Sequence, residues 1–264
     1  MKTFNYEKSA LKSRLENKKL TIGSWLTIPH QSVIEIMSTA GFEWLTIDIE
    51  HSAIDFQTLQ NLLSHIQGNG MEGLVRVSEN NETIIKRVMD AGANGVIVPM
   101  VKSAEEAKKA VSWVKYPPFG KRGVGLSRAQ QYGIGFEKYK TWLQNESVVI
   151  VQIEHIKGVE NLSEILDVEG VDGIIVGPYD LSASMGKPGM FYDDDVKEVL
   201  SRIDEITKSK NKNLGFHVIE SDHTKLMEKI NVDYNFLAFS LDFFFLGDKA
   251  REQMALLKEK LPNE

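Results

Sequence analysis

Short apolar runs alternate regularly along this chain with longer stretches that have helical spacing. Eight runs have the length and β-branched composition of buried strands. The predicted strands are Leu20–Ile28, Trp44–Ile49, Gly73–Val77, Gly95–Met100, Val148–Ile153, Gly173–Val176, Leu214–Ile219 and Phe236–Leu241. The predicted helices are Ser32–Ala40, Phe56–Gln67, Glu82–Ala91, Ala104–Val114, Val159–Leu166, Val196–Lys208, Asp222–Ile230 and Phe243–Leu261. Runs that are apolar on both faces and alternate with helices indicate a parallel sheet covered by helices.

This alternation predicts an α/β protein in which eight strands close into a (β/α)8 TIM-type barrel. Such a barrel takes about 250 residues as one domain, and the chain has 264. A doubly wound open sheet is the rival, but no GxGxxG fingerprint follows the first run. We expect one barrel domain over residues 1–264, with a short N-terminal extension over about residues 1–20. Tyr116 to Ser147 is expected to be irregular, as lids and subunit contacts often are.

Composition and charge exclude several classes of protein. The chain has no cysteine, so disulfide scaffolds, thiolate metal sites and cysteine nucleophiles are excluded. A net charge of −6 provides no field that would attract nucleic acid or anionic lipid. The first residues interleave charges, and no long uninterrupted apolar stretch occurs. We therefore expect a cytoplasmic protein without nucleic-acid or membrane partners.

Polar residues follow several of the predicted strands, where the active site of such a barrel lies. The second run ends in Asp48-Ile49-Glu50-His51, the third contains Arg76, the fifth ends in Gln152-Ile153-Glu154, and the sixth leads into Asp180. An isolated acid after a strand is typically the N-cap of the next helix, and Asp180 could be one. Charged groups facing a barrel interior are costly unless they are paired or bind a metal, so their recurrence on several strands favours a site.

The residue types indicate metal-assisted chemistry on a small anion. Glu154 and Asp180 are hard oxygen donors that suit Mg²⁺ or Mn²⁺, and a metal that they hold would chelate a 2-oxo acid. Arg76 would pair with a carboxylate or an enolate oxygen, and His51 would carry the proton. Asp48 is the acid that the sequence itself offers as a partner of His51.

Other patterns narrow the reaction. None of the eight runs contains a lysine, which disfavours an aldolase that forms a Schiff base. The loops after the last two strands lack the glycine-rich character of a phosphate site. His217 lies inside the seventh run, and its role stays open between packing and function. The remaining histidines fit surface or packing positions; they are His30, His65, His155 and His223.

Several motifs together closely resemble the HpcH/HpaI family of class II pyruvate aldolases. These motifs are D-I-E-H at Asp48–His51, V-R-V at Val75–Val77, V-P-M-V at Val98–Val101, Y-P-P-F-G-K-R-G-V-G at Tyr116–Gly125, V-Q-I-E at Val151–Glu154 and V-E-G-V-D-G-I-I-V-G-P-Y-D-L-S at Val168–Ser182. The similarity covers roughly Ile22 to Leu257. It implies a TIM-type barrel that reversibly cleaves 4-hydroxy-2-oxo acids into pyruvate and an aldehyde, with Mg²⁺, Mn²⁺ or Co²⁺.

The resemblance also implies roles for individual residues. It places the metal on Glu154 and Asp180, and substrate contacts on Gln152, Tyr179 and Asp180. It makes His51 the proton acceptor and Arg76 the group that stabilises the enolate. It assigns Asp90 to raising the basicity of His51. Tyr179 departs from the family pattern, where a smaller residue is common, and would narrow the pocket if it turned inward.

The family further implies a homo-oligomer, a hexamer of dimers that exchange the last helix. Phe243-Phe244-Phe245-Leu246 at the start of that helix is apolar enough to seek a partner, although packing on its own barrel would explain it equally well. Two other functions stay open. One is a citrate-lyase-like acyl-CoA lyase, for which Lys121, Arg122 and Arg128 would supply a basic groove. The other is a non-catalytic ligand-binding barrel.

Overall fold

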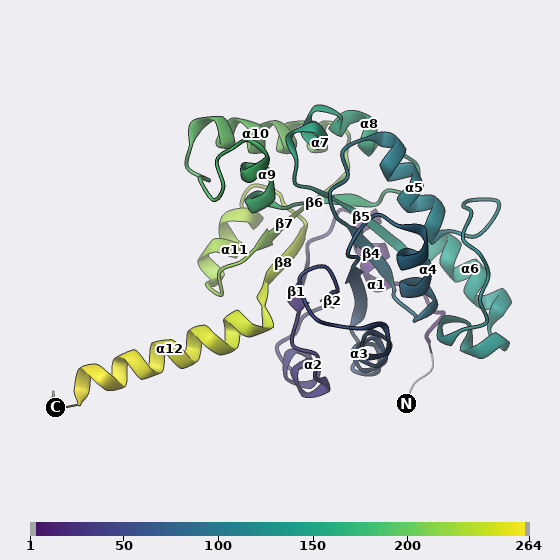
Figure 1. Ribbon diagram of the computed structural model, residues 1–264, viewed down its shortest axis with the longest axis horizontal. Helices are drawn as coiled ribbons and strands as arrows, with labels where there is room; N and C mark the ends of the chain where they lie inside the picture. The colour runs from purple at the N-terminus through teal and green to yellow at the C-terminus, as the bar shows by residue number, and fades with distance from the viewer. Residues whose placement is uncertain (1–3, 262–264) are drawn as a thin grey trace.

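The computed structural model describes residues 4–261 and has a closed barrel of parallel strands surrounded by helices (Figure 1). Each strand pairs with the next along the chain, and β8 returns to pair with β1. The strands are β1 Thr21–Leu26, β2 Trp44–Asp48, β3 Glu72–Arg76, β4 Gly95–Val98, β5 Val148–Ile153, β6 Gly173–Val176, β7 Asn213–Val218 and β8 Phe236–Leu241. The predicted (β/α)8 barrel is therefore confirmed, and the alternative of an open doubly wound sheet is wrong.

The helices follow the strands as the periodicity predicts, with local differences. The longer helices are α2 Gln31–Ser38, α3 Phe56–Gly68, α4 Glu82–Asp90, α5 Ala104–Val114, α6 Phe136–Glu146, α10 Asp194–Ser209, α11 His223–Ile230 and α12 Asp242–Lys260. The shorter ones are α1 Ala10–Glu16, η1 Arg128–Gly133, α7 Ile156–Glu160, α8 Leu162–Leu166 and α9 Pro178–Ser184. The predicted helix Val159–Leu166 is in fact two short helices, which meet at Asn161.

Part of the stretch that we expected to be irregular is helical. Within residues 116–147, α6 buries Tyr139, Trp142 and Leu143, which lie three and four residues apart. This spacing is the ordinary signature of a helix. The glycines on its N-terminal side and the charged residues between the apolar ones obscure it in the sequence. Expecting the whole stretch to be irregular was therefore wrong.

The N-terminal extension closes one end of the barrel. Leu11 and Leu15 of α1 are buried in the cluster that fills the barrel interior, which also contains Trp44 and Phe236. The rings of Trp44 and Phe236 stack with centroids 4.6 Å apart. Glu72, at the start of β3, fixes the entry of α1 by accepting hydrogen bonds from the backbone of Leu11 and from Ser9 Oγ. Because the active end of such a barrel is the opposite one, α1 leaves the mouth open.

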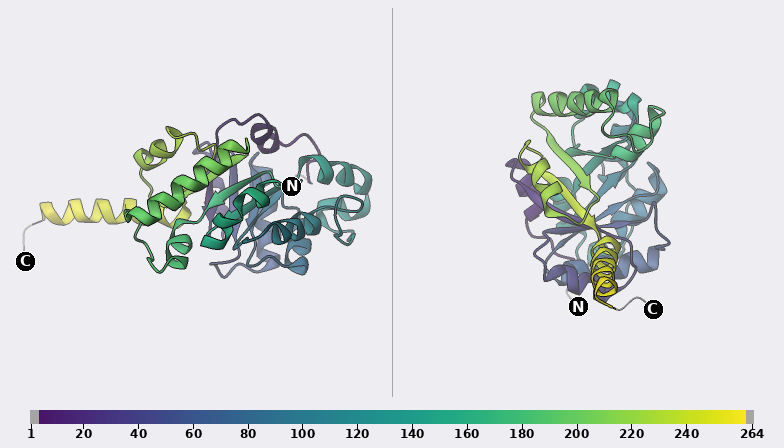
Figure 2. Two further views of the ribbon diagram at one scale, coloured as in Figure 1. Left: turned by 90° about the horizontal axis from the view of Figure 1, so that it is seen from above. Right: turned by 90° about the vertical axis from the view of Figure 1, so that its left-hand side faces the viewer.

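The last helix leaves the barrel instead of packing on it (Figures 1 and 2). Asp242 is its one buried residue, and most of its apolar side chains are exposed, including Leu246, Met254 and Leu257. Its contacts with the barrel lie in its first two turns, where Phe245 packs edge-on against Phe239 and Asp248 accepts a hydrogen bond from Ser221 Oγ. Within the apolar segment Phe243–Leu246, Phe245 packs on its own barrel, whereas Phe243 and Leu246 are exposed. No helix of the described residues is long and apolar enough to cross a membrane.

Candidate active site

A cavity of about 400 Å³ opens at the carboxyl ends of the strands. Six of the eight residues that we singled out line it: Asp48, His51, Arg76, Gln152, Tyr179 and Asp180. Glu154 lies directly beside it through its contact with Gln152, whereas Asp90 lies elsewhere. The cavity also includes Trp25, His217 and the first turn of α12. The topology therefore brings side chains from distant parts of the sequence to one opening.

Asp48 and Arg76 form a buried ion pair on neighbouring strands. Their Cα atoms are direct partners in the β2–β3 register, so both side chains face the interior together. Arg76 Nε donates to Asp48 Oδ1 over 3.0 Å, and Arg76 Nη2 donates to Asp48 Oδ2 over 2.6 Å. Burial alone would raise the pKa of Asp48, but the hydrogen bonds and the charge of Arg76 lower it below its usual range. Both Asp48 oxygens are therefore committed to orienting the guanidinium.

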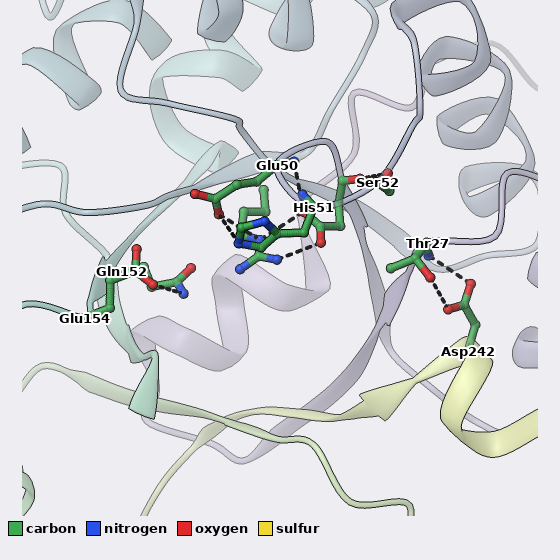
Figure 3. A network of polar contacts seen from close by, with 9 residues as sticks. Thr27, Glu50, His51, Ser52, Gln152, Glu154 and Asp242 are labelled. Atoms are coloured by element: carbon green, nitrogen blue, oxygen red, sulfur yellow. Dashed lines mark hydrogen bonds and ion pairs between the residues drawn. The ribbon is translucent and has the colours of Figure 1, made fainter. Parts of the chain in front are cut away.

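Glu50 joins this pair and was not among the residues that we predicted. Its Oε2 lies 3.2 Å from Arg76 Nε and 3.9 Å from His51 Nε2 (Figure 3). Burial raises the pKa of Glu50, helped by the nearby charges of Asp48 and Asp180. Two-residue alternation places Glu50 on the same side as Asp48, which is the signal that could have identified it.

His51 lies at the rim of the cavity. Its side chain is 65% exposed, and its backbone N–H, rather than its ring, donates to Asp48. Asp48 is therefore not the acid that contacts the imidazole, contrary to the partner suggested by the sequence alone. The acid near the ring is Glu50. A histidine at this position can exchange protons with a ligand and with solvent.

Glu154 is a buried carboxylate on the opposite side of the mouth. Its Oε1 accepts a hydrogen bond from the backbone N–H of Met100 over 2.7 Å. Its Oε2 accepts one from Gln152 Nε2 over 2.6 Å (Figure 3). Met100 has a left-handed backbone with φ of 54°, an uncommon conformation for a residue other than glycine. Burial raises the pKa of Glu154 to about 7, and the charges of Glu50 and Asp180 add to this effect.

The surroundings of Glu154 fit a bound cation. Gln152 Oε1 is buried and has no hydrogen-bond partner among the described residues. A Cβ at Gly177 would come within 2.7 Å of Glu154 Oε2, so glycine keeps this space open. Within residues 4–261 no group of three His, Cys, Asp or Glu side chains surrounds one point, so the chain offers an incomplete shell that a chelating substrate could complete. A cation would offset the repulsion between the carboxylates and supply a partner for the amide oxygen.

Asp180 and Tyr179 lie in the first turn of α9. The N-cap of this helix is Gly177, with no side-chain cap, so Asp180 does not have the capping role that was its alternative explanation. Tyr179 is 52% exposed and packs edge-on against Phe191, with ring centroids 4.7 Å apart. Its ring borders the cavity without filling it, so the expected narrowing is limited.

Asp90 lies near the amino-terminal ends of the strands, away from the mouth of the cavity. It is the last residue of α4, which runs back toward the start of β4, and it accepts a hydrogen bond from Arg122 over 2.9 Å. Burial raises the pKa of Asp90, and the charge of Arg122 opposes this effect. No hydrogen bond or ion pair joins Asp90 to His51 within the described chain. One copy of the chain therefore does not bring these two residues together.

The basic groove that an acyl-CoA enzyme would need is not formed by the expected residues. Arg122 is buried between Tyr116 and Tyr139, and its guanidinium donates to both hydroxyls. Arg128 is also buried, where it donates to the Ala91 carbonyl and to Gln67. Of the three candidates only Lys121 is exposed. The arginines of this segment hold the loop in place, and the expectation that they bind a nucleotide phosphate is wrong.

His217 lines the cavity and packs against one of its walls. It projects from β7 into the cavity, with its ring centroid 5.0 Å from that of Trp25. Burial lowers the pKa of His217 to about 3, and the charge of Arg76 adds to this effect. The imidazole is therefore neutral at physiological pH.

Comparison with known proteins shows to which family the chain is similar. The model of the HpcH/HpaI aldolase/citrate lyase family matches residues 21–244. The chain is 34% identical to 2-keto-3-deoxy-L-rhamnonate aldolase of Escherichia coli over 249 residues, which cover 94% of this chain and 92% of that enzyme. A crystal structure of an HpcH/HpaI aldolase/citrate lyase family protein from Burkholderia cenocepacia superposes with a TM-score of 0.90 at 29% identity, covering 95% of this chain and 100% of that one. An HpcH/HpaI aldolase from Desulfitobacterium hafniense gives a TM-score of 0.87 at 28% identity, covering 99% of both chains. The chain belongs to the HpcH/HpaI aldolase/citrate lyase family.

Proposed function

We propose that this protein is a divalent-metal-dependent aldolase. It would reversibly cleave a 4-hydroxy-2-oxo acid of the 2-keto-3-deoxy type into pyruvate and an aldehyde. The observation that carries the proposal is the pairing, across one cavity, of a cluster of oxygen donors around Glu154 with an arginine oriented by Asp48. Such a cavity would stabilise the negative charge that develops when a carbon–carbon bond breaks.

Glu154 and Asp180 would hold the cation, beside the unpaired amide oxygen of Gln152. When bound, Mg²⁺ or Mn²⁺, or Co²⁺ as the family resemblance allows, would polarise the 2-oxo group of the substrate. The donors are all oxygen atoms, which favours these ions over softer ones. Gln152 and the first turn of α9, with Tyr179, would position the carboxylate end of the substrate.

The residues of the chain would share the proton and charge transfers. The 4-hydroxyl group loses its proton to His51 at the rim, the bond between carbons 3 and 4 breaks, and the aldehyde leaves. The electron pair of that bond becomes the enolate of pyruvate, whose oxygen accepts hydrogen bonds from Arg76. Return of a proton to carbon 3 then completes pyruvate. Asp48 serves this step indirectly, because it holds the guanidinium in one orientation.

The role that the family resemblance gives Asp90 requires a second copy of the chain. Asp90 lies beside Gly125, whose Cβ would be 3.0 Å from Asp90 Oδ2. The loop around Gly125 exposes Val124 and Leu126, at 54% and 67%, and such a patch suits a subunit contact. We propose a homo-oligomer, with the hexamer of helix-swapped dimers as the expected form, in which Asp90 of one copy supports His51 of another. The cytoplasmic location stays a prediction.

A complementation experiment tests this shared site. His51→Ala and Asp90→Asn chains, carrying different tags, are expected to be nearly inactive alone. When they are co-expressed and purified through both tags, each mixed pair regains one site that contains His51 and Asp90. Mixed oligomers that form but remain inactive would show that the two residues do not act together.

A substrate screen tests the reaction itself. The purified protein is incubated with Mg²⁺ and a panel of 2-keto-3-deoxy acids that differ in the tail beyond carbon 4, and pyruvate is measured with lactate dehydrogenase. We expect pyruvate from at least one member, and loss of this activity in His51→Ala. Intact pyruvate release in His51→Ala would remove His51 from the mechanism. Binding of the acids without any pyruvate would favour the non-catalytic barrel.

A further inference from the structure

The charged side chains of the cavity lie on one side of the barrel. Those that line it are Asp48, His51, Arg76 and Asp180, with Glu154 directly beside them. They belong to β2, β3 and β5 and to the segments that follow β2, β5 and β6. In the closed order of strands, β7, β8 and β1 complete the circle on the other side. Among the described residues, no acid, lysine or arginine from that other side lines the cavity.

The side formed by β7, β8 and β1 is apolar at the opening of the cavity. Ile219 follows β7, Leu241 ends β8, and Phe243 and Phe244 lie in the first turn of α12. None of these four side chains has a polar atom. They come from consecutive strands of the closed barrel, so together they form one continuous apolar wall.

The polar groups next to this apolar wall are already paired. Thr27 Oγ1 donates to Asp242 Oδ1 over 2.8 Å (Figure 3). Asp242 is 4% exposed, and its Oδ2 accepts hydrogen bonds from the backbone N–H groups of Thr27 and Ile28 over 2.9 and 2.7 Å. Asp242 is not one of the residues that line the cavity. Its charge is therefore stabilised inside the protein and is not offered to a ligand.

Trp25 and His217 lie deeper on the same side, next to Arg76. The Trp25 ring centroid is 4.4 Å from the guanidinium carbon of Arg76 and 5.0 Å from the ring centroid of His217. Burial lowers the pKa of His217 to about 3, so its imidazole is neutral at physiological pH. Trp25 Nε1 and His217 Nε2 have no partner within the described chain. These two nitrogens lie beside the arginine that binds the oxo acid, and not at the opening.

The proposed reaction assigns the two sides of the cavity to the two halves of the substrate. The negatively charged oxo-acid half needs Arg76 and the cation held by Glu154 and Asp180, which all lie on the charged side. His51 follows β2, and β2 pairs with β1, so carbon 4 lies where the two sides meet. The group beyond carbon 4 then extends over the apolar wall. A carboxylate would lose hydration there without gaining a cation, and hydroxyl groups would lack side-chain partners, whereas an apolar group gains from leaving water.

We propose that the aldehyde half of the substrate carries an uncharged, apolar alkyl or aryl group beyond carbon 4, which packs on Ile219, Leu241, Phe243 and Phe244. The enzyme then favours aliphatic and aromatic aldehydes over hydroxylated or acidic ones. This inference rests on the proposed function, because it names the class of aldehyde that takes part in that reaction.

Three aldehydes with the same four-carbon chain test the proposal. Butanal is apolar, erythrose carries hydroxyl groups, and succinic semialdehyde carries a terminal carboxylate. The purified protein in its native assembly receives Mg²⁺, saturating pyruvate and one aldehyde, and the 4-hydroxy-2-oxo acid formed is measured by chromatography. We expect kcat/KM for butanal to exceed that for either polar aldehyde by about tenfold or more. An equal or higher value for erythrose or succinic semialdehyde would overturn the proposal.

Variants of the apolar wall test its assignment. Phe244→Ser replaces an apolar ring by a hydroxyl group, and should lower the ratio of kcat/KM for butanal to that for erythrose by about fivefold or more. Ile219→Thr changes the shape of the wall less and should shift the ratio in the same direction. Met227→Ser removes an exposed apolar side chain of α11 outside the cavity and should leave the ratio unchanged. The wild-type ratio in both Phe244→Ser and Ile219→Thr would overturn the assignment.

Deuterium exchange separates this inference from the proposed function. The Mg²⁺-loaded wild type in D2O is given pyruvate alone, and the loss of the methyl proton signal is followed by NMR. Exchange combined with a preference for a polar aldehyde, or with no addition of butanal, would overturn this inference and leave the proposed function standing. Absence of both exchange and addition would contradict the proposed function, and this inference with it.

Discussion

Asp48 and Arg76 face each other across β2 and β3 and share two hydrogen bonds, of 3.0 and 2.6 Å, inside the mouth of the barrel. A planar guanidinium held on two points by a carboxylate has one orientation, so its remaining face is fixed toward the cavity. The buried carboxylate of Asp48 thus positions the Arg76 guanidinium, which the proposed reaction needs.

Replacing either Arg76 or Asp48 should lower kcat, and the loss should be larger for Arg76. Arg76→Ala is expected to lower kcat by two to four orders of magnitude, about 3–5 kcal/mol of transition-state stabilisation, because the enolate oxygen loses its donor. Metal affinity should change little. Asp48→Asn keeps the guanidinium but loses its two-point hold, so kcat should fall less. Steady-state kinetics combined with calorimetric metal titration would check both, and an unchanged kcat in Arg76→Ala would refute its role.

Replacement of Glu154 should weaken metal binding itself. Glu154→Ala removes a carboxylate whose pKa is raised to about 7 by burial and by the charges of Glu50 and Asp180. The variant is expected to bind Mg²⁺ or Mn²⁺ at least tenfold more weakly in isothermal titration. Glu164→Ala, which removes an exposed acid from α8, is the matched control and should bind as the wild type does. Equal affinities in all three proteins would exclude Glu154 as a ligand.

The neutral His217 should make stability depend on pH. Burial holds its pKa near 3, below the usual 6.5, so the unfolded chain takes up a proton in this range that the folded chain does not. Stability from this group is complete above pH 6.5 and is lost as the pH falls, by about 1.4 kcal/mol per pH unit. Between pH 7 and 5, His217→Leu should lose about 2 kcal/mol less than the wild type does. Urea unfolding at both pH values measures this, and parallel losses would contradict it.

The helix that closes the barrel floor should contribute strongly to stability. Leu15→Ala in α1 removes a side chain that is 1% exposed against the interior cluster. The expected loss is about 2–5 kcal/mol in the free energy of unfolding, with little effect on the distant mouth. Glu16→Ala, one residue further and exposed, should cost less than about 0.5 kcal/mol. A Leu15→Ala protein as stable as the wild type would show that α1 does not seal the core.

The exposed apolar face of α12 should control assembly. Leu257→Asp places a charge on a side chain that is 48% exposed on the protruding helix. If this helix packs on another copy of the chain, the variant will have a lower mass in light scattering after size exclusion. Lys258→Asp introduces an aspartate at the next position of the helix and serves as the control. The same mass for all three proteins would argue against helix exchange.

The sequence predicts the barrel well because each strand is apolar on both faces and each connection is helical. Asp48, Arg76, Gln152 and Asp180 are recognisable because they follow or end strands whose ends must meet. The side-chain partners of these residues are harder to predict. Only the register of β2 and β3 shows that Asp48 contacts Arg76 and not the ring of His51. The periodicity of the sequence does not contain the direction taken by α12 or the position of Asp90.

The role of His217 is also hard to predict from the sequence. A histidine inside a strand has no sequence signal that separates packing from binding. Its place in the cavity wall beside Trp25 arises only once the barrel closes.

A metal titration tests whether the protein needs a bound divalent cation to release pyruvate. Protein stripped with a chelator and dialysed is given a 4-hydroxy-2-oxo acid, and pyruvate release is followed while Mg²⁺ is added stepwise. We expect no pyruvate before the ion is added, and activity that rises and saturates as the ion binds. Full pyruvate release by the stripped protein, with no response to the ion, would contradict it.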